Sequence, residues 1–288
     1  MKKLLFIINP IAGKSSGANI VERIKKYLDV NSYAPVFIFS EYPEHISEIS
    51  RDALSENYHA IIAVGGDGTV NEVGRVLVHS NMPMGIIPVG SGNGLARHLK
   101  IPLSLKGAMK RINKMDLFEM DAMRINEQYS FCVAGIGFDA EVSRAFQRMK
   151  ARGLYSYIIA CLKCFKQSRN QNFMVKCNDE EYRLNGFMLC FANASQFGNN
   201  AYIAPEADVS DGVLNLILMK KPSFLQIPRL AYRILNGKVF KDASWRQILG
   251  SSFEVTQTNE FAHLDGEPVR LGTSLKVNIE KKALKVIC

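Results

Sequence analysis

Three apolar segments in the first third of the chain each run into a glycine-rich turn, and this pattern constrains the fold most. Residues 60–64 lead into Gly65-Gly66-Asp67-Gly68-Thr69, residues 84–89 into Gly90-Ser91-Gly92-Asn93-Gly94, and residues 4–8 into Asn9-Pro10-Ile11-Ala12-Gly13-Lys14. Each apolar run has the length of a buried strand, and helical patterns follow the turns. In an open parallel sheet such turns gather at the carboxyl edge, where ligands bind. The sequence therefore predicts an α/β fold with a ligand site at that edge.

The turn at 65–69 has the chemistry of a phosphate site. Paired glycines let the backbone approach an anion, and the N–H groups of the following helix point towards it. Asp67 can hold a cation against the same anion. A nucleotide is the expected ligand, although a tight strand-to-helix turn with an Asp at the helix start would use the same residues.

The pattern of elements divides the chain near residue 120. Before that point strands and helices alternate, which predicts a parallel sheet in an α/β nucleotide-binding domain of residues 1–120. The expected strands are 3–9, 34–39, 60–64 and 84–89, and the expected helices are 17–29, 44–56, 69–79 and further helical residues up to 113. After it, short apolar runs predict a mainly antiparallel β-sandwich domain over residues 121–288. These runs are 173–177, 187–193, 213–219, 253–256, 275–279 and 284–287, and helices are expected around 139–167 and 223–236.

Composition indicates a folded protein inside the cell. The chain has 288 residues, of which 47% are hydrophobic, so it can bury a sizeable core. No apolar run approaches the ~18 residues that span a bilayer, and the start of the chain runs directly into a strand rather than a signal peptide. We therefore expect a cytoplasmic protein with reduced, buried thiols. Cys161 and Cys164 form a lone C-x-x-C pair, for which helix packing is favoured over a zinc or redox role.

The net charge of +9 calls for an acidic partner. Nucleic acid is disfavoured, because the chain lacks basic runs interleaved with exposed aromatic residues. Anionic lipid fits better, since basic residues cluster at 100–114 and at 144–169, and the second cluster flanks the apolar segment 154–162. That segment is too short to span a membrane but suits a helix lying on its surface. The sequence predicts peripheral contact with an anionic membrane, with a core helix carrying solvated charged ends as the alternative.

Two carboxylate-rich turns in the second half are further candidate sites. Asp265-Gly266-Glu267 places two carboxylates on one turn, although Asp-Gly is also an ordinary β-hairpin sequence. Residues 205–212 have the carboxylates of a hard-cation loop without EF-hand spacing, and a polar hairpin turn is the alternative. None of the five His residues has a zinc spacing and no Ser-His-Asp pattern stands out, so hydrolase chemistry is excluded.

Taken together, these segments resemble the diacylglycerol kinase catalytic family, which includes soluble bacterial lipid kinases and sphingosine kinases and is more distantly related to NAD kinases. The matching pieces span nearly the whole chain in the family's order: Asn9-Pro10 with Gly13-Lys14, Gly65 to Thr69 with Asn71-Glu72, Gly90 to Asn93 with Leu95-Ala96-Arg97, Pro205 to Gly212, and Leu264 to Glu267. Gly94 departs from the family, which often has Asp there, and this leaves the acceptor lipid open. Ser40 replaces a usual Thr and keeps the hydroxyl.

The resemblance implies roles for individual residues. Asp67 would act through Mg²⁺ and water at the ATP phosphates. Apart from the resemblance, the position of Lys14 just past the first glycine turn lets it reach phosphate or a lipid headgroup, with a solvated surface role as the alternative. The nucleotide would be lined by Asn9, Ser40, Gly65, Gly66, Gly68, Thr69 and Ser91. Asp265 would accept the proton of the lipid hydroxyl as general base with support from Glu267, so the reaction would lie in a cleft between the domains. A structural Mg²⁺ would bind Asp211, helped by backbone carbonyls near Asp208 and Val213.

The expected activity is ATP-dependent, Mg²⁺-requiring phosphorylation of a lipid hydroxyl in phospholipid biosynthesis, with diacylglycerol as acceptor and phosphatidic acid as product. Gly94 slightly favours a sphingoid base as the alternative acceptor. An NAD kinase would share the 65–68 turn but would leave the basic segment and the 265–267 turn unexplained. A non-catalytic nucleotide-binding membrane sensor would not need Asp265. The sequence leaves open whether the chain forms a homodimer.

Overall fold

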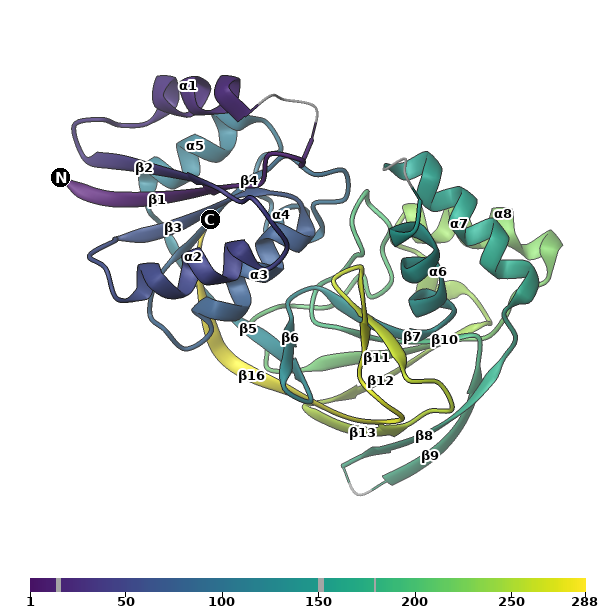
Figure 1. The fold of residues 1–288 in the computed structure, drawn as a ribbon. Helices are drawn as coiled ribbons and strands as arrows, with labels where there is room; N and C mark the ends of the chain where they lie inside the picture. The colour runs from purple at the N-terminus through teal and green to yellow at the C-terminus, as the bar shows by residue number, and fades with distance from the viewer. Residues whose placement is uncertain (14–16, 150–152, 179) are drawn as a thin grey trace. The chain divides into compact units, whose positions relative to one another are not determined.

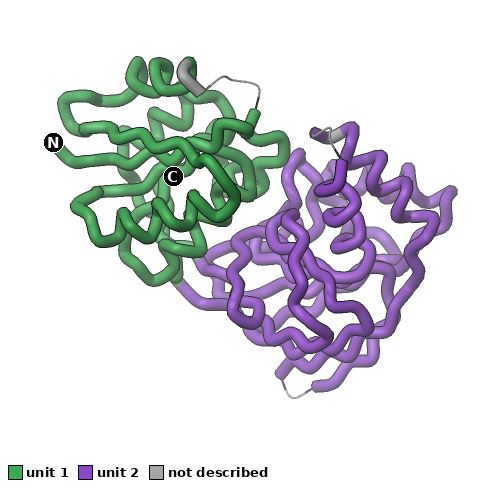
Figure 2. Tube along the Cα trace, in the orientation of Figure 1, with its two compact units in different colours: residues 1–120, 282–288 green, residues 121–281 purple. Residues whose placement is uncertain are grey.

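The computed structural model describes residues 1–13, 17–149, 153–178 and 180–288 (Figure 1). The chain forms two compact units (Figure 2). Unit 1 contains residues 1–120 and 282–288, and unit 2 contains residues 121–281. The sequence predicts a division near residue 120, and residues 282–288, which were expected in the second domain, group with unit 1. None of the helices in the described ranges combines the length and the apolar character that a bilayer span requires.

Unit 1 is an α/β domain on a parallel sheet of order β2-β1-β3-β4. Its strands are β1 (Lys2–Ile8), β2 (Tyr33–Phe39), β3 (Ala60–Gly65) and β4 (Met84–Pro88). Its helices are α1 (Gly17–Tyr27), α2 (His45–Leu54), α3 (Asp67–Leu77), α4 (Gly94–His98) and α5 (Leu105–Lys114). Helices α1 and α5 cover one face of the sheet, and α2 and α3 cover the other (Figure 1). Because both faces are covered, β3 is buried along its whole length, as its continuous apolar sequence predicts.

Unit 2 contains an antiparallel sheet of order β12-β11-β10-β7-β14-β15. Its strands are β7 (Val133–Gly137), β10 (Met188–Ala192), β11 (Leu214–Met219), β12 (Trp245–Gly250), β14 (Phe261–Leu264) and β15 (Glu267–Arg270). The other strands are β5 (Leu117–Ile125), β6 (Gln128–Ser130), β8 (Gln171–Cys177), β9 (Glu180–Gly186), β13 (Ser252–Thr256) and β16 (Ser274–Ile287). The apolar core lies between the two sets, where Phe191 of β10 and Phe253 of β13 have ring centroids 5.9 Å apart. Unit 2 is therefore the predicted β-sandwich.

Four expected elements, two helices and two strands, differ from the sequence prediction. The helix expected at 139–167 is two helices, α6 (Phe138–Gln147) and α7 (Leu154–Gln167). The helix expected at 223–236 is a 3₁₀ turn, η1 (Phe224–Gln226), followed by α8 (Ile227–Leu235) and a second 3₁₀ turn, η2 (Val239–Lys241). The strands expected at 275–279 and 284–287 form the single strand β16, whose charged residues 280–282 made it look like two. Its first half pairs with β13 in unit 2, and its end pairs with β4 in unit 1.

Candidate active site

The carboxyl ends of the parallel strands bring the predicted nucleotide residues together in unit 1. The N–H of Asn9 donates to the carbonyl of Val64 at 3.1 Å, and the N–H of Ser40 donates to that of Ile8 at 2.9 Å. Nδ2 of Asn9 donates to Oγ1 of the buried Thr69 at 3.2 Å. The turn after β1 is thereby tied to the first turn of α3, as expected for strands whose ends share one edge.

Glycine is required where the 65–69 turn touches the 90–94 turn. A Cβ on Gly90 would lie 2.5 Å from the Cα of Gly66, and a Cβ on Gly65 would lie 2.2 Å from Oγ1 of Thr69. Residues 66–68 at the start of α3 are half-buried, so part of this backbone is accessible. The first N–H groups of a helix have no partner within it, so this edge can bind an anion.

Asp67 is the first residue of α3 and joins these two turns. Its Oδ2 accepts the N–H of Asn93 at 2.8 Å, and its Oδ1 accepts the N–H of Gly94 at 2.6 Å. These bonds satisfy N–H groups at the start of α4, where Asn93 takes a left-handed φ of 52°. Sequence reasoning assigned Asp67 to metal and phosphate alone and missed this structural tie.

A Mg²⁺–nucleotide complex fits this set of groups. Mg²⁺ in such sites uses one or two carboxylates and completes its coordination with phosphate oxygens and water. In the part of the chain that the structure describes, no three His, Cys, Asp or Glu side chains gather to hold a metal by themselves. Nδ2 of the buried Asn93 donates to the carbonyl of Gly90 at 2.7 Å, while its Oδ1 accepts no hydrogen bond from any described residue. A bound ligand would supply the hydrogen-bond donor or cation that this unsatisfied oxygen lacks.

The remaining predicted nucleotide residues have simpler surroundings. Gly68 lies in the first turn of α3, and Ser91 is exposed in the third turn. Lys14 lies outside the described residues. Nε of Arg97, on α4, donates to the carbonyl of Gly92 at 2.9 Å, so this side chain holds the third turn in shape.

In unit 2, Asp265 and Gly266 form the turn between β14 and β15. Their φ angles of 49° and 89° are both left-handed, which is the geometry that makes Asp-Gly a hairpin sequence. The Asp265 carboxylate is bound by residues 130–133. Its Oδ1 accepts from Ser130 Oγ at 2.7 Å, Cys132 N at 2.8 Å and Val133 N at 3.2 Å, and its Oδ2 accepts from Phe131 N at 2.9 Å. The carboxylate is therefore held in one position, while Glu267 is exposed at the start of β15.

A buried pair, His263 and Asp139, supports the same turn and was missed in the sequence. Nδ1 of His263 accepts the N–H of Gly266 at 3.2 Å, so Nε2 carries the proton and donates to Oδ2 of Asp139 at 2.6 Å. The Cys190 thiol donates to the same oxygen at 3.1 Å. Burial, reinforced by the Asp139 charge, raises the pKa of this thiol well above its usual value. The only sequence signal was a His two residues before an Asp-Gly turn.

Gly135→Ala should disrupt this pair. A Cβ at Gly135 would lie 2.4 Å from Oδ2 of Asp139 and 2.6 Å from Nε2 of His263. We expect the free energy of unfolding to fall by about 2–4 kcal/mol, because the new methyl group overpacks β7 and parts a buried hydrogen bond. Urea unfolding measures this, with Gly85→Ala in β4 as control. There the closest atom is the flexible end of Ile62, so an equal loss in both variants would contradict the role given to the pair.

The loop at 205–212 has its own hydrogen bonds. Oδ1 of Asp208 accepts from Ser210 N at 2.9 Å, and Oδ1 of Asp211 accepts from Val213 N at 2.8 Å. Both aspartates are exposed. The N–H of Gly212 donates to Oδ2 of the buried Asp121 at 2.7 Å, a second residue that sequence reasoning missed. Exposed carboxylates and backbone carbonyls are the oxygen ligands that Mg²⁺ prefers, and the structural metal stays a prediction.

If the loop binds Mg²⁺, a chelator should lower the melting temperature of the wild type but not that of Asp211→Asn. Mg²⁺ at about a hundredfold its Kd would stabilise the folded state by roughly 2.7 kcal/mol. Differential scanning fluorimetry with and without EDTA measures this. Asp29→Asn is the control, because Oδ1 of Asp29 accepts a similar local bond from Asn31 N at 3.1 Å. If EDTA leaves the melting temperature of the wild type unchanged, the prediction of a structural metal is wrong.

All six cysteines are free, as the composition predicts. Burial is the largest cause that raises the pKa of Cys161 to about 12, and it also raises the pKa of Cys164. Metal binding and disulfide exchange both use the thiolate. The raised thiol pKa values disfavour both roles for the C-x-x-C pair on α7, and helix packing stays the favoured interpretation.

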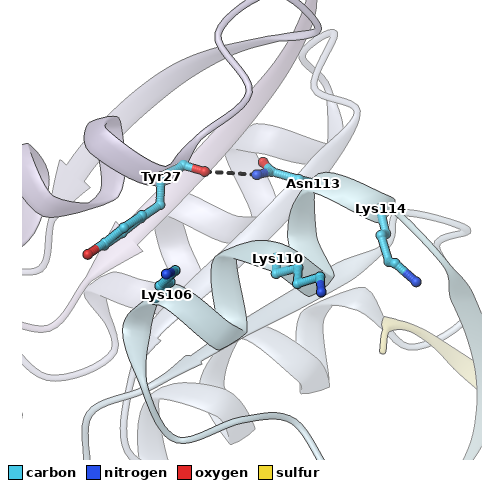
Figure 3. A pocket seen from close by; sticks show the side chains of 5 residues that line it. All are labelled: Tyr27, Lys106, Lys110, Asn113 and Lys114. Carbon is cyan, nitrogen blue, oxygen red and sulfur yellow. Dashed lines mark hydrogen bonds between the residues drawn. The ribbon is translucent and has the colours of Figure 1, made fainter.

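A basic pocket of about 340 Å³ lies beside α5 in unit 1 (Figure 3). Its lining residues are Tyr27, Lys106, Lys110, Asn113 and Lys114. Nδ2 of Asn113 donates to the carbonyl of Tyr27 at 2.8 Å and so joins the end of α1 to α5. None of the predicted site residues lines this pocket, so it is separate from the glycine turns.

Comparison with known proteins agrees with these two units. Residues 3–125 match the diacylglycerol kinase catalytic domain, and residues 132–288 match the YegS C-terminal NAD kinase beta sandwich-like domain. The chain is 26% identical to uncharacterized protein sll0036 of Synechocystis sp. (strain ATCC 27184 / PCC 6803 / Kazusa), over 93% of this chain and 62% of that one. It therefore spans less than two thirds of the length of this relative.

Other relatives are covered more completely. The chain is 27% identical to a protein of Mycobacterium tuberculosis (strain H37Rv) named diacylglycerol kinase, over 82% of this chain and 79% of that one. A crystal structure of a diacylglycerol kinase from Bacillus anthracis str. Sterne has the same fold, with a TM-score of 0.76 at 18% identity over 99% of this chain and 96% of that one. The chain belongs to the lipid kinase family that joins a diacylglycerol kinase catalytic domain to a YegS-type C-terminal domain.

Proposed function

We propose that this chain uses ATP to phosphorylate the free hydroxyl of diacylglycerol, giving phosphatidic acid. The observation that supports this most is the meeting of the 65–69 and 90–94 turns, where Gly66 lies against Gly90 and Asp67 binds the start of α4. This edge suits the phosphates of a nucleotide. The names of relatives from Mycobacterium tuberculosis and Bacillus subtilis favour diacylglycerol as acceptor.

Each group of this chain then has a defined task. Mg²⁺ bound with the nucleotide supplies positive charge that offsets the charge of the phosphates. The N–H groups at the start of α3 orient these phosphates, and the Asn9–Thr69 hydrogen bond fixes the turn beside them. The lipid hydroxyl oxygen bonds to the γ-phosphorus as the bond to the β–γ bridging oxygen breaks. Asp265 takes the hydroxyl proton on its carboxylate, with Glu267 in support.

The substrate also sets where the protein works. Diacylglycerol resides in a bilayer, so the kinase meets it at a membrane surface on the cytoplasmic side. The net charge of +9 favours an anionic surface.

Incubation of the purified chain with γ-labelled ATP, Mg²⁺ and a panel of acceptors tests the proposal. The panel holds diacylglycerol, sphingosine and NAD⁺, and labelled phosphatidic acid is the expected product. Label found only in sphingosine phosphate would move the assignment to the sphingoid-base kinase that Gly94 favours. Label found only in NADP⁺, or in none of the acceptors, would overturn the proposal.

A further inference from the structure

Large hydrophobic side chains stay exposed on the η1–α8–η2 segment of unit 2. Phe224 is 76% exposed and Leu225 is 90% exposed. Tyr232, Leu235 and Phe240 are exposed as well. Tyr232 and Leu235 are three residues apart on α8, so they lie on one face of that helix, and Leu225 lies in the 3₁₀ turn just before it. This face has no described partner.

Helix α7 carries a similar stripe. Its exposed residues Tyr155, Ile158 and Leu162 recur at intervals of three and four, so they too share one face. The end of α7 contacts the residues that lead into η1. Nζ of Lys221 donates to the carbonyl of Ser168 at 2.7 Å and lies 4.7 Å from the centre of the Phe165 ring. Figure 1 shows α7 and α8 in the same part of unit 2, and we call the exposed residues of α7, η1, α8 and η2 the α7–α8 surface.

The charged side chains of α7, η1, α8 and η2 are all basic. No Asp or Glu occurs between Glu141 and Asp179, or between Asp211 and Asp242. The exposed basic residues among the apolar ones are Lys163, Lys166, Arg229, Lys238 and Lys241. A partner for this surface must therefore be apolar with negative charge at its boundary, as an anionic bilayer is. A second copy of the chain fits less well, because a two-fold contact would set this basic surface against itself.

We infer that the α7–α8 surface docks this chain on an anionic bilayer. Phe224 and Leu225 enter the boundary between headgroups and acyl chains, and the Lys and Arg residues lie against lipid phosphates. The sequence alone pointed to 154–162, and the structure adds η1 and α8, where Leu225 is the most exposed apolar side chain of the surface. The inference deepens the proposed function by naming the surface that meets the lipid, yet docking can be measured without ATP or turnover.

Sedimentation of the full chain with vesicles tests the inference. One set contains phosphatidylcholine alone, and the other contains phosphatidylcholine with phosphatidylglycerol. We expect binding to the anionic set, and we expect it to weaken as salt is added. The double variant Phe224→Ser/Leu225→Ser should bind at least about tenfold more weakly, because burying one such side chain is worth about that factor. The matched control Val30→Ser/Leu249→Ser removes two other exposed apolar side chains and should bind like the wild type.

Three outcomes would overturn the inference. They are equal binding to both vesicle types, equal binding by wild type and Phe224→Ser/Leu225→Ser, and lipid-free self-association that this variant abolishes. The last would assign the surface to a second copy. Normal docking without kinase activity would count against the proposed function alone, and kinase activity with docking unaffected by the variant would count against the surface alone.

Discussion

Asp265→Asn is expected to lower kcat by about 10²–10⁴-fold, the usual effect of losing a general base. The substitution removes the proton-accepting carboxylate from the turn between β14 and β15. It also places an NH₂ group among donors, since Asp265 accepts hydrogen bonds from Ser130 and from the backbone of residues 131–133. One buried donor would lose its partner, at a cost of about 1–3 kcal/mol in stability. Steady-state kinetics and urea unfolding measure the two effects.

Ser130→Ala separates the two causes. It removes one hydrogen bond to Asp265 Oδ1 and leaves the charge and the backbone bonds in place. We expect a loss of about 1 kcal/mol in stability and at most a few-fold loss in kcat. ATP affinity should stay near the wild-type value in both variants, because the nucleotide residues lie in unit 1. If Asp265→Asn keeps most of its kcat on each lipid, the base assignment is wrong.

Asp67→Asn should reduce turnover by about 10³-fold or more, because the charge that steadies Mg²⁺ at the phosphates is worth several kcal/mol. The amide keeps one oxygen for the start of α4 but cannot accept both N–H groups, those of Asn93 and Gly94. A stability loss of about 0.5–2 kcal/mol should therefore accompany the loss of activity. Kinase assays across Mg²⁺ concentrations and thermal melts measure both.

Ser104→Ala is the control for the loss of stability expected in Asp67→Asn. Ser104 caps α5 in the same unit by accepting the N–H of Gly107, and it lies outside the glycine turns. Its loss should cost a similar amount of stability and leave turnover unchanged. If the folded Asp67→Asn variant turns over at a near-normal rate, the assignment of the nucleotide edge fails.

The sequence predicted unit 1 well because its signals are local. Strands buried on both faces have continuous apolar sequences, and β3 and β4 run into turns whose close packing requires glycine, as at Gly65 and Gly90. The element bounds there differ from expectation by only a few residues. Asn9, Thr69 and Asp67 are near one another because parallel strands end at a common edge, which is also readable from sequence.

The hydrogen-bond partners of the Asp265 turn could not be predicted from the sequence. Asp139 and His263 are 124 residues apart, and neither has a periodic pattern that points to the other. The four donors to Asp265 come mostly from backbone N–H groups, which carry no sequence signature. Likewise, the tie between Asp67 and the start of α4 depends on how two turns pack. Local sequence propensity cannot predict side-chain pairings that depend on tertiary contacts. The carboxyl edge of the parallel sheet can be predicted, because it follows from the order of strands and helices.

Strand β16 has a consequence for how the chain is made. Its final residues, among them the fully buried Val286, complete the packing beside β4, yet they leave the ribosome after all of unit 2. Residues 121–281 take roughly 8–32 s to synthesise at the usual 5–20 residues per second. During that interval unit 1 has a sheet edge without its last strand, and such edges attract other chains. The first unit to emerge is therefore the last to be finished.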